Sequence, residues 1–171
     1  MTTLSKYRAI GLAIAAFVFA FDQWLKGFVV NDLGLDRIGE NYPLLPFFDF
    51  TRTNNYGVSL GLFEATSMEM RWILVGVTAL IACVVAVWMF REKLFGDIAA
   101  LGMVLGGALG NITDRWKHGY VIDYADLHFG DFRPFLIFNV ADAAITIGVV
   151  IILARALFMR ETEDNAQDAS A

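Results

Sequence analysis

The sequence contains one cysteine, Cys83, and two histidines among its 171 residues. A single cysteine cannot form an internal disulfide, and there is no second thiol to share a metal ion. Neither histidine belongs to an HExxH motif, so the chain lacks that zinc-protease signature. Cys83 lies in an apolar run, and we interpret it as a buried small hydrophobic residue.

Charged residues are also scarce. They make up 18% of the chain against 57% hydrophobic residues, and the mean hydropathy is +0.56. This composition is too apolar for an ordinary soluble domain and favours one membrane domain over residues 1–160. The net charge of -5 comes partly from the acidic tail 161–171, whose composition predicts disorder. No basic stripe or nucleic-acid motif accompanies this acidic balance, so we do not expect nucleic acid as a partner.

Four apolar runs have about the length that a bilayer requires of a helix. They cover residues 9–30, 71–90, 94–113 and 135–159. The first run is too long for a removable signal peptide and has no cleavage site, so we expect it to be retained. The sequence therefore predicts a membrane α-helical fold with four transmembrane helices and both termini on one side. The short basic turn Arg91-Glu92-Lys93 falls on that side, which favours cytoplasmic termini.

Two segments between the helices have the features of surface structure. In residues 31–68, polar and apolar residues alternate around the turn-forming run Asn54-Asn55-Tyr56-Gly57, which predicts a β-hairpin whose second strand carries Val58, Leu60 and Leu62. Its aromatic and aliphatic content suits the membrane surface. The segment 116–134 mixes polar and aromatic residues and is interpreted as a second surface element, a periplasmic loop or lid.

Glycines in the third helix are spaced for helix packing. Gly102, Gly106 and Gly110 are four residues apart and share one face, a pattern that allows helix backbones to approach closely in lipid. Gly107 lies off this face and is less easily explained by packing.

Polar residues gather at one membrane face. An up-down-up-down topology brings together the end of helix one, the start of helix two, the end of helix three and the start of helix four. The residues concerned are Asp22 and Lys26 in the first helix, Asn111, Asp114 and Arg115 in the third, and Asn139 and Asp142 in the fourth. If the fourth helix begins at 135, Asp142 lies about 10 Å inside the outer boundary. Charged groups at this depth indicate a functional site.

Asp123 and Asp142 are the best candidates for catalysis. Two carboxyls close together in a low-dielectric pocket share one proton, which supplies both an acid and a base for peptide hydrolysis. The alternative is that Asp142 only hydrogen-bonds between helices and that Asp123 is a solvated loop residue. We expect the remaining charges to form the ion pairs Asp22–Lys26 and Asp114–Arg115, which would stiffen the site.

Other chemistries and other classes of protein remain as alternatives. Asp123, Asp126 and His128 are conceivable metal ligands, but no metal motif supports them. A serine–lysine catalyst would use Ser59 and Lys26, although no nucleophile motif surrounds Ser59. A proton-coupled transporter would need polar residues through both membrane halves, whereas the inner halves here are apolar. A structural protein would use the polar cluster only to hold its helices together.

Several motifs, in chain order, carry a resemblance to a known family. They are DQWLK at 22–26, NYG at 55–57, GGALGNITDR at 106–115, VIDY at 121–124 and FNVADAAI at 138–145. Together they resemble the bacterial lipoprotein signal peptidases, the signal peptidase II family. Small departures are the adjacent Asn54, which makes the choice of Asn55 ambiguous by one position, Leu60 in place of a frequent aromatic residue, and Asp126, an extra acid near the pair.

The resemblance implies an aspartic endopeptidase of the bacterial inner membrane, with its site near the periplasmic leaflet. Asp123 and Asp142 would activate water to cut prolipoproteins before a diacylglyceryl-modified cysteine. By the same resemblance, Asn55, Asn111, Arg115 and Asn139 would position the substrate and the pair, and Asp22, Lys26, Gly107, Asp114 and Ala141 would shape the pocket. Membrane phospholipid would surround the helices, globomycin would block the site, and we expect a monomer without cofactor or metal.

Overall fold

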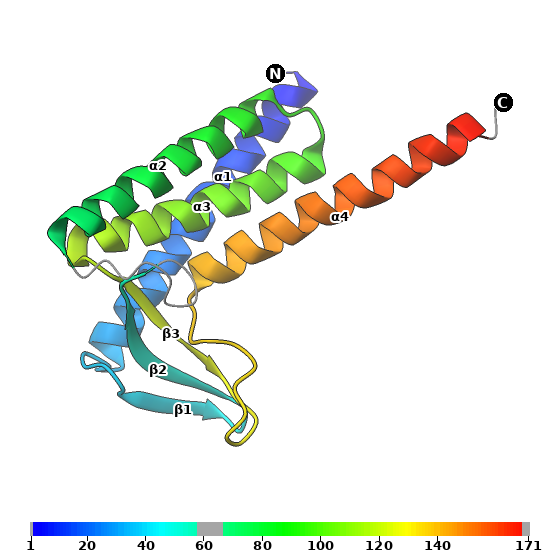
Figure 1. The fold of residues 1–171 in the computed structure, drawn as a ribbon. Helices are drawn as coiled ribbons and strands as arrows, with labels where there is room; N and C mark the ends of the chain where they lie inside the picture. Colours follow the sequence, from blue (N-terminus) through cyan, green and yellow to red (C-terminus); the bar gives the residue numbers. More distant parts are fainter. Residues whose placement is uncertain (1, 58–66, 169–171) are drawn as a thin grey trace.

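The computed structural model describes residues 2–57 and 67–168, with side chains as far as Phe158. Within these residues, four helices are long and apolar enough to cross a membrane. They are α1 (Thr3–Gly27), α2 (Met68–Arg91), α3 (Phe95–His118) and α4 (Val140–Asp168), and a π-helical turn, η1 (Phe28–Asp32), extends α1. The predicted four-helix membrane fold is confirmed in this respect (Figure 1).

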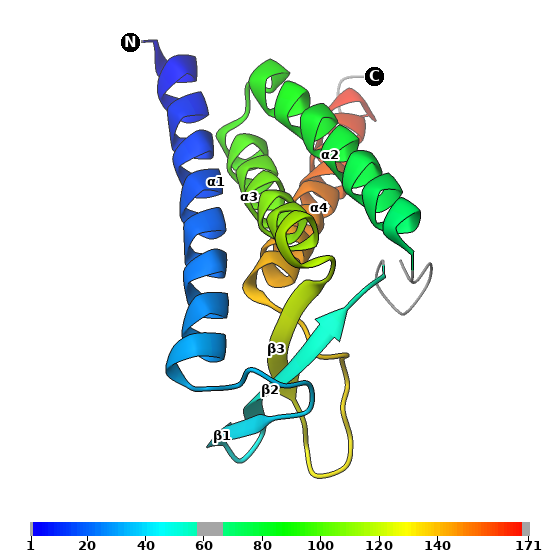
Figure 2. The same ribbon diagram turned by 90° about the vertical axis from the view of Figure 1, so that its left-hand side faces the viewer.

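Helix α3 is the centre of the bundle. It lies between α1, α2 and α4 when the molecule is seen along its length (Figure 2) and buries a larger share of its residues than the other helices do. A Cβ atom at Gly102 would lie 2.5 Å from the Gly11 carbonyl oxygen, and one at Gly106 would lie 2.5 Å from the Ala15 carbonyl oxygen. The predicted glycine face is therefore confirmed, because only glycine lets α1 approach α3 so closely.

A three-stranded antiparallel sheet covers one end of the bundle. Its strands are β1 (Asn41–Leu45), β2 (Phe48–Asn55) and β3 (Val121–Leu127), in the order β1-β2-β3. In both ribbon views the start of α1 and the far end of α4 lie at the opposite end of the bundle (Figures 1 and 2). An apolar cluster of Val29, Leu35, Ile122, Tyr124 and Ala125 packs the sheet against the end of α1. The sheet is thus fixed to the end of the bundle where the polar residues gather.

The hairpin differs from the sequence prediction in the position of its turn. The hairpin pairs Asn41–Leu45 with Phe48–Asn55, and its turn falls at Pro46-Phe47 instead of Asn54–Gly57. Asn54 and Asn55 are still in β2, where they pair with Ile122 and Val121 of β3. A partner strand on that side keeps the chain extended where turn chemistry alone predicts reversal. The predicted second strand at 58–62 lies outside the described residues.

The fourth helix also differs from the prediction. It begins at Val140 instead of 135, because residues just before it run along the sheet, where Phe138 exchanges backbone hydrogen bonds with Ala125. Asp142 is therefore in the first helical turn. The predicted helix start at 135, from which its depth was estimated, is wrong. At its other end, α4 is helical through Asp168, within the tail for which composition predicts disorder. Good helix formers such as Glu161, Glu163 and Gln167 account for this continuation.

Cys83 is exposed on α2, and the interpretation that it is buried in the protein is wrong. In a helix on the outside of a membrane bundle, an apolar residue can face lipid, so hydrophobicity alone does not predict burial.

Candidate active site

The ammonium group of Lys26 joins the first and third helices at the centre of the polar cluster. Its Nζ atom lies 2.8 Å from Asp22 Oδ2 and 2.8 Å from Asp114 Oδ2, and all three side chains are almost completely buried. The predicted Asp22–Lys26 pair is present. The predicted Asp114–Arg115 pair is wrong, because Asp114 faces Lys26 on α1 while the Arg115 guanidinium donates to the Gly57 carbonyl oxygen at 2.8 Å.

The two carboxylates of this cluster also hold the backbone beside each candidate catalytic aspartate. Asp114 Oδ2 accepts a hydrogen bond from the backbone N–H of Ile122 at 3.1 Å, one residue before Asp123. Asp22 Oδ1 accepts one from the backbone N–H of Ala141 at 3.0 Å, one residue before Asp142. The cluster therefore fixes the strand and the helix from which the two aspartates project.

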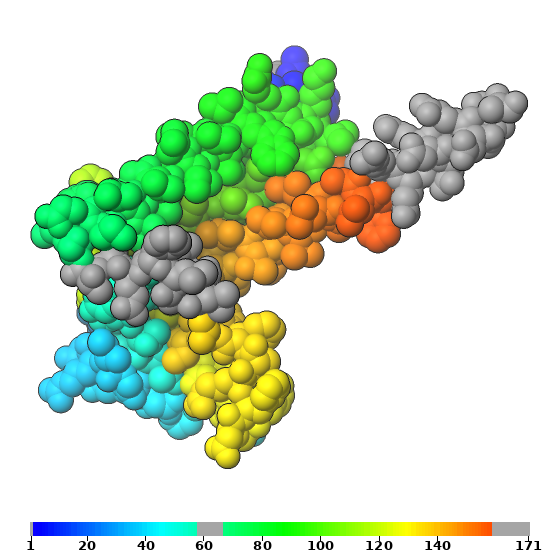
Figure 3. Space-filling model, in the orientation of Figure 1, coloured from blue at the N-terminus to red at the C-terminus, as the bar shows by residue number. Residues whose placement is uncertain are grey.

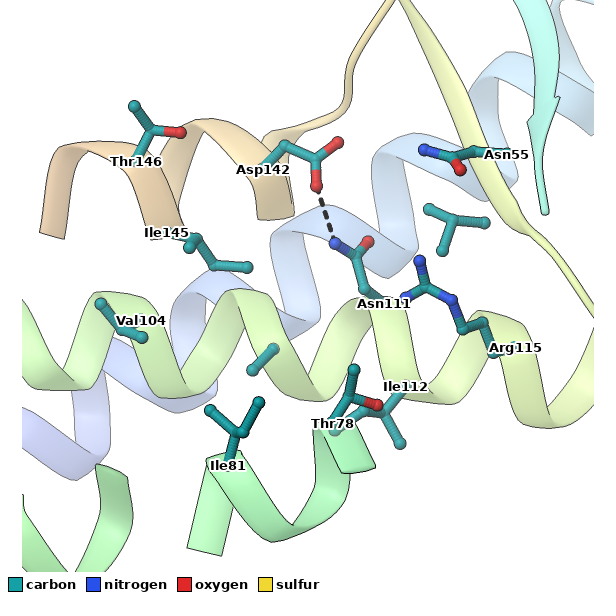
Figure 4. Close-up of a pocket in the computed structure, with 12 residues that line it drawn as sticks. Asn55, Thr78, Ile81, Val104, Asn111, Ile112, Arg115, Asp142, Ile145 and Thr146 are labelled. Atoms are coloured by element: carbon teal, nitrogen blue, oxygen red, sulfur yellow. Dashed lines mark hydrogen bonds between the residues drawn. The ribbon is translucent and has the colours of Figure 1, made fainter. Parts of the chain in front are cut away.

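Two asparagine side chains connect Asp123 to Asp142. Asn139 Nδ2 donates to Asp123 Oδ1 at 2.6 Å and to Asn111 Oδ1 at 3.3 Å. Asn111 Nδ2 in turn donates to Asp142 Oδ1 at 2.8 Å (Figure 4). The prediction placed Asn139 within the fourth helix, but it precedes that helix, and its Oδ1 accepts from the Asp142 N–H at 2.9 Å. This is the geometry of a helix N-cap.

Asp123 has the electrostatic surroundings of a group that holds a proton near neutral pH. Burial raises the pKa of Asp123 from 3.8 to about 7, and the negative charge of Asp142 adds to the increase. Hydrogen bonds from Asn55 and Asn139, together with the charge of Lys26, act in the opposite direction. Asp123 is in β3 and only 1% exposed, so the alternative that it is a solvated loop residue is wrong.

Asp142 and Asn55 line two cavities that meet at the site. The first, with a volume of about 280 Å³, is a largely apolar groove between α2, α3 and α4. Its polar end holds Asn111, Arg115, Asn55 and Asp142, as Figure 4 shows, and the rest is lined by residues such as Thr78, Ile81, Val104 and Ile145. The second, of about 610 Å³, lies between the same Asn55 and Asp142 and the segment 133–138. Asp142 is thus accessible from an apolar side and from the side of the sheet.

Glycine is required where α3 meets the start of α4. A Cβ atom on Gly107 would collide with the carbonyl oxygen of Ala141, which is itself completely buried. On the neighbouring face, a Cβ atom on Gly110 would lie 2.5 Å from Asp22 Oδ2. Gly107 is therefore explained by helix packing, and this packing places Asp142 beside Asn111.

The structure resolves the choice between Asn54 and Asn55 and shows what the other acidic and histidine candidates contact. Asn55 contacts Asp123 and lines both cavities, whereas the amide oxygen of Asn54 is buried without a hydrogen-bond partner. Asp126 and His128 face other groups, since Asp126 pairs with Arg133 and His128 Nε2 lies 3.2 Å from Asp49 Oδ2. Among the described residues, no group of three or more His, Cys, Asp or Glu side chains is arranged to hold a metal ion. Ser59 lies outside the described residues.

Two residues of the site were not predicted. Gln23 Nε2 donates to Asp114 Oδ1 at 2.8 Å and to Asp22 Oδ2 at 3.3 Å, so it bridges the two supporting carboxylates. Arg71, in the first turns of α2, donates its Nε to the Arg115 carbonyl oxygen at 2.8 Å and a terminal nitrogen to the Trp116 carbonyl oxygen. It thereby caps the end of α3. Gln23 could have been predicted, because it lies between Asp22 and Lys26 in the sequence. Arg71 could not, because basic residues are common at the ends of membrane helices whether or not they belong to a site.

Comparisons with known proteins agree in one family. Residues 14–158 match the family model described as signal peptidase (SPase) II. The lipoprotein signal peptidase of Sphingopyxis alaskensis is 51% identical over 95% of this chain and 93% of its own length, and that of Rhizorhabdus wittichii is 48% identical over 98% and 96%. A solved bacterial membrane enzyme, determined by the in meso method at 2.3 Å resolution, has the same fold, with a TM-score of 0.76, 26% identity and 91% coverage of each chain.

Proposed function

The chain belongs to the signal peptidase II family, a family of membrane peptidases that act on prolipoproteins, and from this premise we propose that Asp123 and Asp142 form its catalytic pair. The activity is that of an intramembrane aspartic endopeptidase that cuts before the diacylglyceryl-modified cysteine. The supporting observation is the bridge of Asn139 and Asn111 between the two carboxyls. A proton-coupled transporter and a purely structural protein do not fit this family.

The reaction needs one protonated and one ionised carboxyl. In the proposed mechanism, Asp142 takes a proton from a water molecule whose oxygen attacks the scissile carbonyl carbon, while Asp123 gives its proton to the carbonyl oxygen. Asp142 then passes its proton to the leaving cysteine nitrogen as the C–N bond breaks. Asp123 recovers a proton when the carbonyl re-forms, and no covalent intermediate is required. The raised pKa of Asp123, about 7, supports its role as the acid.

The two cavities suit the two parts of the proposed substrate. The groove between α2, α3 and α4 is mostly apolar and belongs to the membrane-spanning part of the chain, so it suits the hydrophobic signal segment and the acyl chains. The second cavity lies between Asn55 and Asp142 on one side and the segment 133–138, which precedes α4, on the other, so it suits the mature chain as it leaves the membrane. The scissile bond then lies where the cavities meet, at Asn55 and Asp142.

The proposed orientation puts the sheet at the outer face of the bacterial inner membrane. The opposite end of the bundle carries the short basic connection Arg91-Glu92-Lys93 and the residues Lys6 and Arg8, which suits a cytoplasmic location. Exposed aromatic residues at the sheet, including Phe47, Phe129 and Phe132, suit contact with the membrane surface. The polar cluster would then lie near the periplasmic leaflet.

A cleavage assay tests this proposal directly. Purified protein in detergent micelles is incubated with a diacylglyceryl-modified prolipoprotein, with and without a chelator and with and without globomycin. We expect the wild type to cut before the lipidated cysteine, to be unaffected by the chelator and to be blocked by globomycin. Asp123→Asn and Asp142→Asn should fold normally and lose activity at least about 100-fold, because each removes one partner in proton transfer.

Asp97→Asn is the matched control. Asp97 pairs with Arg155 at 2.7 Å at the far end of the bundle, so its replacement removes one partly buried carboxylate without touching the site. It should cut at a rate close to that of the wild type. Cleavage by either folded site variant would refute the assignment of the pair, and failure of the wild type to cut would refute the proposed activity.

A further inference from the structure

The segment 133–138 is attached to β3 at both of its ends. At one end, Phe138 and Ala125 exchange backbone hydrogen bonds of 3.1 and 2.8 Å. At the other end, the Arg133 guanidinium donates to the Asp126 carboxylate, with Nε 3.0 Å from Oδ1 and a terminal nitrogen 3.4 Å from Oδ2. Between these attachments the segment forms one wall of the cavity that Asp142 and Asn55 also line. In Figure 3 the chain around residue 130 stands out beside the strands as a separate lobe.

Asp126 is well placed to act as the fixed end of this attachment. It is three residues from Asp123 on the same strand and only 1% exposed, and the Thr51 hydroxyl donates to its Oδ2 at 3.0 Å. Strand alternation puts Asp126 and Asp123 on opposite faces of β3, so Asp126 is not a third member of the pair. A buried carboxylate needs its charged partner, and this requirement holds Arg133 in place although the Arg133 side chain is half exposed.

We propose that Asp126 is a positioning residue for substrate binding, which acts through Arg133 to hold the segment 133–138 in place as the wall of the cavity opposite Asn55 and Asp142. This inference rests on the proposed function, because it assigns a role in recognising the same substrate. Asp126 does not touch the reacting atoms. Its loss therefore leaves the chemical step intact and loosens the wall that the substrate contacts.

The kinetic consequence follows from this division of roles. Interactions made equally in the ground state and the transition state change KM and leave kcat unaffected. Asp126→Asn should raise KM for the lipidated prolipoprotein about fivefold to tenfold and change kcat by less than about twofold. Arg133→Gln should have an effect of the same kind, since it releases the other end of the same attachment.

A double-mutant cycle separates action through Arg133 from two independent effects. If Asp126 acts only through Arg133, the variant that carries both Asp126→Asn and Arg133→Gln should have the KM of the more impaired single variant. If the effects multiply, the residues act independently and the inference is overturned. An unchanged KM in both single variants overturns it as well.

Two further variants control for charge and for stability. Asp131→Asn removes an exposed negative charge from the same loop without breaking the Asp126–Arg133 pair, and its KM should equal that of the wild type. Thr51→Val removes the hydroxyl that donates to Asp126 but leaves the pair, so it should lower the melting temperature without raising KM. A raised KM in Thr51→Val or Asp131→Asn would show that the effect does not come from the pair, and would overturn the inference.

Failure of the inference can be told apart from failure of the proposed function. If the wild type does not cut, or if Asp142→Asn cuts normally, the proposed function fails and the role of Asp126 fails with it. If the wild type cuts, Asp142→Asn does not, and the Asp126 and Arg133 variants are normal, only the inference fails. Should Asp126→Asn not fold, Arg133→Gln decides alone, with a raised KM in support and an unchanged KM against.

Discussion

When Asp123 is replaced with asparagine, the stability of the variant relative to the wild type should increase as the pH rises. The pKa of Asp123 is about 7 in the folded protein against 3.8 for the free side chain. Between these values the folded state binds more protons than the unfolded state does, so the free energy of unfolding falls as the pH rises and levels off above pH 7. Asparagine carries no charge and removes this dependence, while its amide oxygen can still accept from Asn139.

The size of the effect follows from the pH interval. From pH 5 to pH 7 the wild type should lose about 1.4 kcal/mol per pH unit, or about 3 kcal/mol in total. For a protein of this size, 1 kcal/mol corresponds to roughly 2–4 °C in melting temperature. We therefore expect the difference in melting temperature between Asp123→Asn and wild type to increase by about 6–12 °C between pH 5 and pH 8.5.

Thermal unfolding in detergent micelles, followed by the fluorescence of the four tryptophans, measures this difference. Asp97→Asn serves as the control, because it removes a carboxylate paired with Arg155 and should not become more stable than the wild type at high pH. A difference between Asp123→Asn and wild type that stays constant from pH 5 to pH 8.5 would refute the reasoning. It would mean that Asp123 is ionised across this range despite its burial and the nearby charge of Asp142.

Three further predictions concern the same site. Because Asp123 must be protonated to act as the acid, the cleavage rate should fall about tenfold per pH unit well above pH 7. A cleavage rate that is constant from pH 7 to pH 9 would contradict this role. Gly107→Ala should lower both the melting temperature and the cleavage rate, because its Cβ collides with the Ala141 carbonyl oxygen. Gly76→Ala, whose Cβ would have nothing within 4 Å, should lower neither. Lys26→Met should lower the free energy of unfolding by about 3–5 kcal/mol, because it leaves the buried carboxylates of Asp22 and Asp114 without a counter-charge. An unchanged melting temperature would show that Lys26 is not needed to balance them.

The membrane helices could be predicted because their signal is local. A run of about 20 apolar residues is enough to predict a span, and four such runs predict the side on which the polar ends meet. The glycine face of α3 was predictable for the same reason, since a spacing of four residues marks one side of any helix. These features depend on the sequence of one segment and not on what packs against it.

The details that the sequence did not predict depend on contacts between distant segments. Asn54 and Asn55 have the chemistry of a turn, but β3 pairs with them and keeps them extended. Asp114 is next to Arg115 in the sequence, yet adjacent helical residues do not face each other, and Asp114 instead meets Lys26 on α1. The start of α4 at Val140 likewise depends on the pairing of Phe138 with β3. No local pattern contains this information.

The buried charges around Lys26 are better explained by positioning than by stability. One ammonium group faces two carboxylates. In buried ion pairs, the electrostatic attraction usually does little more than offset the free energy required to remove the charges from water. What the carboxylates add is a pair of acceptors for the N–H groups of Ile122 and Ala141, which directly precede the two catalytic candidates. Apolar residues of similar volume could fill the same space at lower electrostatic cost, but they would leave both N–H groups without a partner and the aspartates free to shift. The cluster therefore belongs to the site. Lys26 holds the two carboxylates in place, and the carboxylates in turn fix the positions of Asp123 and Asp142 relative to each other.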